Sequence, residues 1–205
     1  MKRSILWAFL TVVLIVVSLL SGCAKQPRIL LYTREGSGAL ELMLREEVEV
    51  MIRLLEEAGL RVEIATLYEE PYYGAGVPFG FKPDLLLEDV KVSKYAGFLL
   101  PCMAAGQPGI IEARAVEMVK EAAAQGKPIA AQHGSIHTLA RAGLLKGRRY
   151  AMGLAVFPEG IYSGTGVVRD GNIITSGICP EKTKESGRPD GTVELTRELI
   201  EAVLH

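Results

Sequence analysis

The stretch PIAAQHGSIHTLARAGLLKG, from Pro128 to Gly147, decides the fold class of this chain. It begins with a short apolar run of the β-strand type that ends at Gln132, and a tight turn and a helical pattern follow. Gly143 stands where a C-cap glycine ends a helix. A strand, a turn and a helix in this order are typical of α/β proteins, in which such a turn can hold a reactive side chain at the edge of the sheet.

The same alternation extends over the rest of the chain. Other strand-like runs end near Thr33, Thr66, Pro101 and Ser176, and helical patterns lie between most of them. This alternation predicts an α/β fold with a mostly parallel sheet covered by helices. Because ligands of such sheets bind outside the carboxyl ends of the strands, we expect the segments after Thr33, Pro101, Gln132 and Ser176 to converge on one crevice.

The start of the chain has the pattern of a secretory signal. The basic MKR precedes a nearly unbroken apolar run from Ser4 to Leu20. The stretch Leu20-Ser21-Gly22-Cys23 resembles the bacterial lipobox, in which the cysteine is lipidated and becomes the new N-terminus. A plain signal peptide and a permanent transmembrane anchor are the alternatives, since the run is almost long enough to span a bilayer.

The lipobox interpretation divides the chain into three parts. They are a signal peptide over residues 1–22, a lipidated N-terminus with a short tether over 23–27, and one domain over 28–205. Two or more acyl chains on Cys23 would anchor the domain stably to a lipid bilayer. We therefore expect an exported protein that is held at the cell membrane or at an outer membrane.

The composition argues against nucleic acid as a partner and permits one disulfide bond. A formal net charge of −1, with no long like-charge run, predicts no contact with nucleic acid. An exported compartment permits a disulfide between Cys102 and Cys179. If their strands lie two positions apart in the sheet, about 9.6 Å separates them, which is beyond disulfide reach unless the loops lean inward. Both a disulfide and free thiols are therefore retained as hypotheses.

Three blocks in a fixed order resemble the ThiJ/PfpI superfamily, which has the class I glutamine amidotransferase-like fold. They are YAGFLLP (95–101), GKPIAAQHGSIHTLARAGLLKGRRYA (126–151) and VVRDGNIITSG (167–177). The resemblance runs from about Arg28 to His205. It implies a flavodoxin-like, three-layer α/β sandwich with a mostly parallel sheet and helices on both faces. The family includes cysteine hydrolases, proteases, deglycase-like enzymes and chaperone-like members.

The resemblance also implies a disarmed active site. The family's nucleophile is the cysteine of a Cys-His-Gly motif, on a strained elbow between a strand and a helix. We assign Gln132 to that position, and His133 and Gly134 to the next two. An amide has no counterpart of a thiolate, so we expect the family's thiol chemistry to be absent. A glutamate that contacts the thiol is also part of the family pattern. We assign it to Glu35, and Glu41 and Glu46 are the alternatives.

Several nearby side chains are candidates to replace the missing nucleophile. Cys102 follows the third strand and is either a nucleophile or a small buried residue. His133 is a weak catalytic candidate, acting with water or with Cys102. Ser135 is better explained as a helix-start residue. His133 and His137 share a helical spacing but lack a clear third ligand, so no metal site and no cofactor is predicted.

These residues support three functional hypotheses. The leading one is an exported, membrane-anchored pseudoenzyme that binds a small polar molecule or a peptide end. Its expected pocket consists of Glu35, Gln132, His133, Gly134 and Cys102. The first alternative is a hydrolase or amidase-like enzyme that uses His133 with water or with Cys102. The second is an interaction module at the cell envelope, forming a homodimer as many members of the family do.

Overall fold

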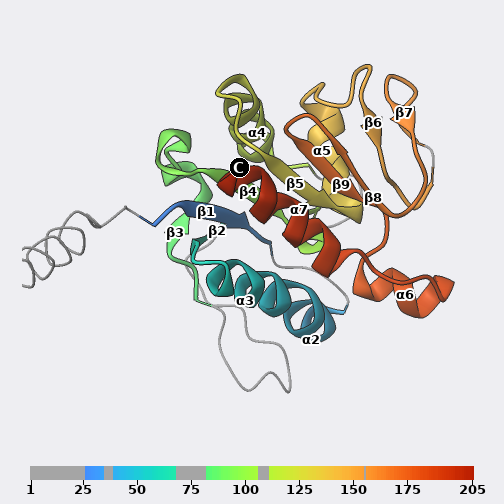
Figure 1. The fold of residues 1–205 in the computed structure, drawn as a ribbon, viewed down its shortest axis with the longest axis horizontal. Coiled ribbons are helices and arrows are strands. Elements are labelled where there is room, and N and C mark those ends of the chain that lie inside the picture. Colours follow the sequence, from blue (N-terminus) through green and yellow to red (C-terminus); the bar gives the residue numbers. More distant parts are fainter. Residues whose placement is uncertain (1–25, 35–38, 68–81, 106–110, 155) are drawn as a thin grey trace, which may run out of the picture.

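The computed structural model describes residues 26–34, 39–67, 82–105, 111–154 and 156–205. A seven-stranded sheet crosses this part of the chain in the order β3-β2-β1-β4-β5-β9-β8 (Figure 1). The strands are β1 (Arg28–Tyr32), β2 (Arg61–Thr66), β3 (Leu85–Leu86), β4 (Gly97–Leu100), β5 (Ile129–Gln132), β8 (Val167–Asp170) and β9 (Ile173–Ser176). All neighbours pair in parallel except β8 and β9, which are antiparallel. The prediction of a mostly parallel sheet is confirmed.

Helices cover both faces of this sheet, as the three-layer prediction requires. One face carries α2 (Leu40–Met43), a π-helical turn (Leu44–Val48), α3 (Glu49–Glu57) and α7 (Thr192–Leu204). The other face carries α4 (Ala113–Ala124) and α5 (Ile136–Arg141). The short helix α6 (Pro180–Ser186) follows β9, and β6 (Arg149–Tyr150) pairs with β7 (Ile161–Tyr162) in a separate small sheet.

Alternate residues of each central strand point into opposite layers of the core. In β1, Leu30 and Tyr32 belong to the cluster under α4 and α5, whereas Ile29 and Leu31 belong to the cluster under α3 and α7. All four side chains are fully buried. This two-sided burial explains why the strands read as unbroken apolar runs. Each such side chain contributes about 1.5–3 kcal/mol through removal from water.

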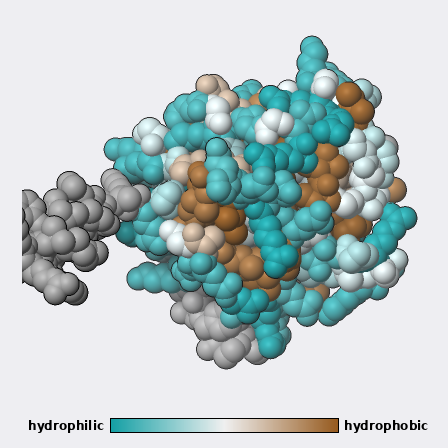
Figure 2. Space-filling view, in the orientation of Figure 1, coloured by the Kyte–Doolittle hydropathy of each residue, from teal (hydrophilic) through white to brown (hydrophobic). Residues whose placement is uncertain are grey.

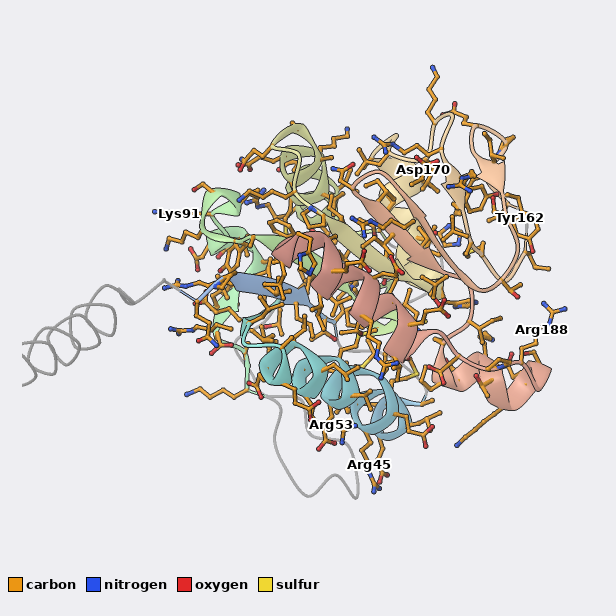
Figure 3. All side chains as sticks on the ribbon, in the orientation of Figure 1. Arg45, Arg53, Lys91, Tyr162, Asp170 and Arg188 are labelled. Atoms are coloured by element: carbon orange, nitrogen blue, oxygen red, sulfur yellow. The ribbon has the colours of Figure 1, made fainter. Side chains whose placement is uncertain are left out.

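The outer side of the helical layer is hydrophilic. Figure 2 shows that the face carrying α3 and α7 is mainly hydrophilic, with apolar patches between the polar side chains. In Figure 3, Arg45 and Arg53 point away from the domain below this layer, and both residues are exposed. The inner side of the same helical segment, which includes Met51 and Leu55, is fully buried. The helix is therefore amphipathic, as a layer between sheet and solvent requires.

The N-terminal residues of the chain, including the expected signal peptide and Cys23, lie outside the described residues, and so does Glu35. Within the described ranges, the helices are all too short or too polar to traverse a bilayer. The described chain enters β1 at Arg28. This is the amino end of a parallel strand. The chain therefore enters the sheet on the side opposite to the carboxyl ends of the parallel strands (Figure 1).

One glycine after β9 is closely surrounded by backbone. A Cβ atom at Gly177 would lie 2.6 Å from the carbonyl carbon of Met152 and 2.8 Å from the oxygen of Thr165. The Gly177 N–H also donates a hydrogen bond to that Thr165 oxygen, at 3.1 Å. Backbone cannot move aside as a flexible side chain can, so only glycine fits here.

We predict that Gly177→Ala lowers the free energy of unfolding by about 1–3 kcal/mol, the usual cost of overpacking. The matched control is Gly166→Ala, because a Cβ atom there meets nothing within 4 Å. That variant should stay within about 0.5 kcal/mol of the parent. Urea unfolding of the full-length chain measures both values, and equal stability of the two variants would contradict the close approach.

Candidate active site at the carboxyl edge of the sheet

The turn after β5 has the strained geometry of an elbow, and the strained residue is His133. Its φ angle is 42°, and no other non-glycine residue in the described ranges has a positive φ. Gln132 is extended, with φ −108° and ψ 131°. Backbone strain of this kind costs on the order of 1–3 kcal/mol and persists where the surroundings impose it. The elbow therefore lies one residue beyond the position that we assigned to it.

Gln132 does not line a pocket, which corrects the sequence-based expectation. Its side chain is fully buried, and its amide nitrogen donates to the oxygen of Ile178 at 2.8 Å and to Thr192 Oγ1 at 3.1 Å. Successive side chains of a strand point to opposite faces, so Gln132 and His133 cannot face the same space. Gln132 ties β5 to the start of α7 and has a structural role.

His133 faces a thiol from the neighbouring strand. Cys102 follows β4, which pairs in parallel with β5, and it opens a 3₁₀ turn (Cys102–Ala105). Its sulfur lies 3.5 Å from Nδ1 of His133. The backbone N–H of Gly134 also donates to this sulfur. The thiol and the imidazole thus meet at the elbow, although they come from two different strands.

Cys179 completes the group from the next strand. It lies after β9, precedes α6 and is fully buried. The sulfurs of Cys102 and Cys179 and a ring nitrogen of His133 all lie within 4.8 Å of one another. The two cysteines are free thiols. The loops therefore lean inward, and the sulfurs are much closer than the spacing between their strands suggests.

The hydrogen bond between the two thiols shifts their pKa values in opposite directions. The hydrogen bond from Cys102 lowers the pKa of Cys179 to about 5, against the effect of burial, and hydrogen bonds from His133 and from the Lys182 N–H act in the same direction. The hydrogen bond to Cys179, followed by burial and the nearby Glu47, raises the pKa of Cys102. Both shifts favour a pair in which Cys179 is the thiolate and Cys102 keeps the proton.

A carboxyl group from the helical layer lies beside the thiols. Glu47 is fully buried, and its Oε1 accepts a hydrogen bond from the backbone N–H of Cys102 at 2.7 Å. Burial raises the pKa of this carboxyl well above its usual range. Its second oxygen, Oε2, has no hydrogen-bond partner among the described residues.

Glu47 is not among the predicted site residues, although the sequence carries a signal for it. Glu47 lies at helical spacing from Leu44 and Met51, which are both buried, so it belongs to the apolar face of its helix. It also falls in the π-helical turn, a feature that is frequent at functional sites. The other glutamates do not take its place, since Glu46 is exposed and Glu41 pairs with Arg45 at 3.4 Å.

The remaining candidates have structural contacts. Ser135 is buried and donates a hydrogen bond to the oxygen of Pro101. His137 is exposed, and its ring packs edge-on against Phe157 at a centroid distance of 5.0 Å. The structure therefore brings together Cys102, His133 and Gly134 from the expected pocket, and adds Cys179 and Glu47 from outside it.

These groups form a compact cluster at the carboxyl edge of a parallel sheet. It contains two thiols, an imidazole and a buried carboxyl group. This edge is where α/β proteins of this kind carry their active sites. Fold and site together define the class: a flavodoxin-like α/β domain of the glutamine amidotransferase-like type, with a histidine on the strand-to-helix elbow and a cysteine of the neighbouring loop beside it.

The chain belongs to the DJ-1/PfpI family, whose sequence profile matches residues 34–184. It is also similar to an uncharacterized protein of Archaeoglobus fulgidus, with 36% identity over 138 residues, which cover 64% of this chain and 82% of that protein. The resemblance to the ThiJ/PfpI superfamily is thereby confirmed.

Solved structures support the same fold. A ThiJ/PfpI domain protein from Brachyspira murdochii has a TM-score of 0.65 at 17% identity, over 87% of this chain and 97% of that one. DJ-1beta of Drosophila melanogaster has a TM-score of 0.63 at 21% identity, over 87% and 90% of the two chains. At these identities the likeness speaks for the fold and not for the activity.

The position of the elbow can be tested by placing a cysteine on either side of the turn. In a chain whose three natural cysteines are replaced by serine, we predict that His133→Cys gives a thiol that iodoacetamide alkylates readily at pH 7. Gln132→Cys should react slower by on the order of tenfold or more, because its side chain is buried and a buried thiol is inert. Faster alkylation of the Gln132→Cys thiol would restore our original assignment.

Proposed function

We propose that this domain is a thiol-dependent redox protein, in which Cys102 and Cys179 cycle between a dithiol and a disulfide. The observation that carries this proposal is the approach of both sulfurs and a His133 nitrogen to within 4.8 Å. A disulfide forms when one thiolate attacks a mixed disulfide on its neighbour, so the two thiols have to be this close. The hydrogen bond from Cys102 lowers the pKa of Cys179, which favours a thiolate in the pair.

The two cysteines have different roles in this cycle. Cys102 is partly exposed and Cys179 is fully buried, so Cys102 meets the partner disulfide. Transfer of its proton to Cys179 or to His133 leaves a Cys102 thiolate, which attacks one sulfur of the partner. The partner's other sulfur leaves and takes up that proton. The Cys179 thiolate then attacks Cys102, closes the disulfide and releases the second partner sulfur as a thiolate, which takes a proton from water. The partner thereby gains the two electrons that the domain loses.

The presence of a second thiol distinguishes this proposal from the hydrolase hypothesis. A cysteine hydrolase forms a thioester on one sulfur and needs a base beside it. A second thiol in contact with the first would instead trap an oxidised or disulfide-linked Cys102. Recognition of a ligand through Gln132 has no support, because its amide donates to Ile178 and Thr192.

We also propose that Cys23 carries the lipid anchor. The supporting observation is the lipobox pattern at residues 20–23 after a signal-like apolar run. The described chain enters β1 at the edge of the sheet opposite to the thiols. An anchor at that end would leave the thiol edge directed away from the membrane. An exported compartment is also where dithiol and disulfide forms interconvert without constant reduction.

The redox proposal predicts one reversible disulfide per chain. A full-length Cys23→Ser chain retains Cys102 and Cys179, and glutathione disulfide should oxidise it to a form without free thiols. Cys102→Ser should abolish oxidation, whereas Cys179→Ser should stop at a glutathione adduct on Cys102. Mass spectrometry of the intact chain separates these products. If the parent chain never forms the disulfide but cleaves nitrophenyl esters in a Cys102-dependent way, the hydrolase hypothesis is correct instead.

The anchor proposal predicts incorporation of a fatty acid into the chain. In a bacterial host given an alkyne-labelled fatty acid, the natural chain should be labelled and should sediment with membranes. Cys23→Ser should lose the label, and Cys102→Ser is the matched control that should keep it. A natural chain without label would show that the N-terminal segment is a plain signal peptide or an unmodified anchor.

A further inference from the structure

We propose that the reduced site binds a zinc ion through the sulfurs of Cys102 and Cys179 and Nδ1 of His133. This inference goes beyond the redox proposal, because it uses the same sulfurs for coordination and involves no electron transfer. The three groups come from separate segments, after β4, β5 and β9, and the described structure holds their ligand atoms within 4.8 Å of one another.

The separation of the ligand atoms fits tetrahedral zinc. Zinc–sulfur bonds of about 2.3 Å and zinc–nitrogen bonds of about 2.0–2.1 Å place a thiolate and an imidazole nitrogen about 3.6 Å apart. The observed distance from Cys102 Sγ to His133 Nδ1 is 3.5 Å. Two thiolates on the same ion lie about 3.8 Å apart. The sulfurs therefore need to move by no more than about an ångström from their upper limit of 4.8 Å.

The choice of ligands favours zinc over hard cations. Two thiolates and one neutral imidazole balance the charge of a divalent ion and match the preference of borderline-soft metals for sulfur and nitrogen. Three protein ligands leave one coordination position open, the arrangement of zinc sites that bind water or a substrate. Oxygen-preferring ions such as Mg²⁺ and Ca²⁺ would find no oxygen among these three ligands.

The surroundings hold the ligands in place. The left-handed backbone of His133 turns its ring out of the strand and toward the loop after β4. Gly153 lies on the other side of this ring, where a Cβ atom would come within 3.5 Å of Nε2. Glu47 Oε1 accepts a hydrogen bond from the backbone N–H of Cys102, with 2.7 Å between nitrogen and oxygen. Such contacts behind the ligands set the orientation on which metal affinity depends.

Competition with a chromophoric chelator tests the site in the reduced, full-length Cys23→Ser chain in detergent. We expect one Zn²⁺ per chain. Co²⁺ in place of Zn²⁺ should give a sulfur-to-cobalt charge-transfer band. His133→Ala, Cys102→Ser and Cys179→Ser should each weaken zinc binding by about a hundredfold or more, since each removes a direct ligand.

The matched control is His137→Ala, one helical turn further along, because His137 packs against Phe157 outside the cluster. It should bind zinc as the parent does. Circular dichroism confirms that each variant is folded. Unchanged affinity in His133→Ala, no zinc binding by the reduced parent chain, or binding of Cu⁺ but not Zn²⁺ would overturn the proposal. Disulfide formation that persists in a chain without zinc affinity would refute the metal site alone, whereas zinc binding without disulfide formation would refute only the redox proposal.

Discussion

Parallel pairing of β4, β5 and β9 is the constraint on which the site depends. Parallel neighbours end at the same edge of a sheet, so the residues that follow them meet in space although long helical segments separate them in sequence. Cys102, His133 and Cys179 each follow one of these strands. The hydrogen-bonded ladders and the two apolar layers around them supply the stability that the site itself does not. The strained backbone of His133 and the buried carboxyl of Glu47 both cost free energy, and the surrounding core offsets that cost.

The electrostatics of the site follow from this crowding. Two thiols and a carboxyl group in a small buried volume cannot all carry negative charge at little cost. The hydrogen bond between the thiols lowers the pKa of Cys179 and raises that of Cys102, and burial raises the pKa of Glu47. Perturbed ionisation of several neighbouring groups is typical of functional sites. The proposed dithiol–disulfide couple and the proposed zinc site both use the sulfurs of Cys102 and Cys179. They are mutually exclusive states, since oxidation removes both thiolates that a metal would need.

The family relationship acquires a specific meaning from this arrangement. The family pattern places a cysteine on the strained elbow and a glutamate beside it. In this chain the strained position holds His133, and the thiol reaches the same place from the loop after β4. Glu47 contacts the backbone of that thiol-bearing residue from the helical layer. The chemical components of a thiol site are thus present, although the residue on the elbow is an imidazole.

The sequence by itself determined the α/β class, the three-layer arrangement and the family. Parallel strands that are buried on both faces need apolar residues throughout, so they are visible as apolar runs. The three motif blocks of the family also occur in the family's order. It did not determine which residue occupies the elbow, since a shift of one residue between Gln132 and His133 leaves the apolar pattern of the strand unchanged. Nor did it reveal the approach of Cys102 to Cys179, because strand spacing says nothing about the direction in which a loop leans. Only the tertiary structure decided these points, since backbone dihedrals and contacts between loops arise from packing across the whole sheet.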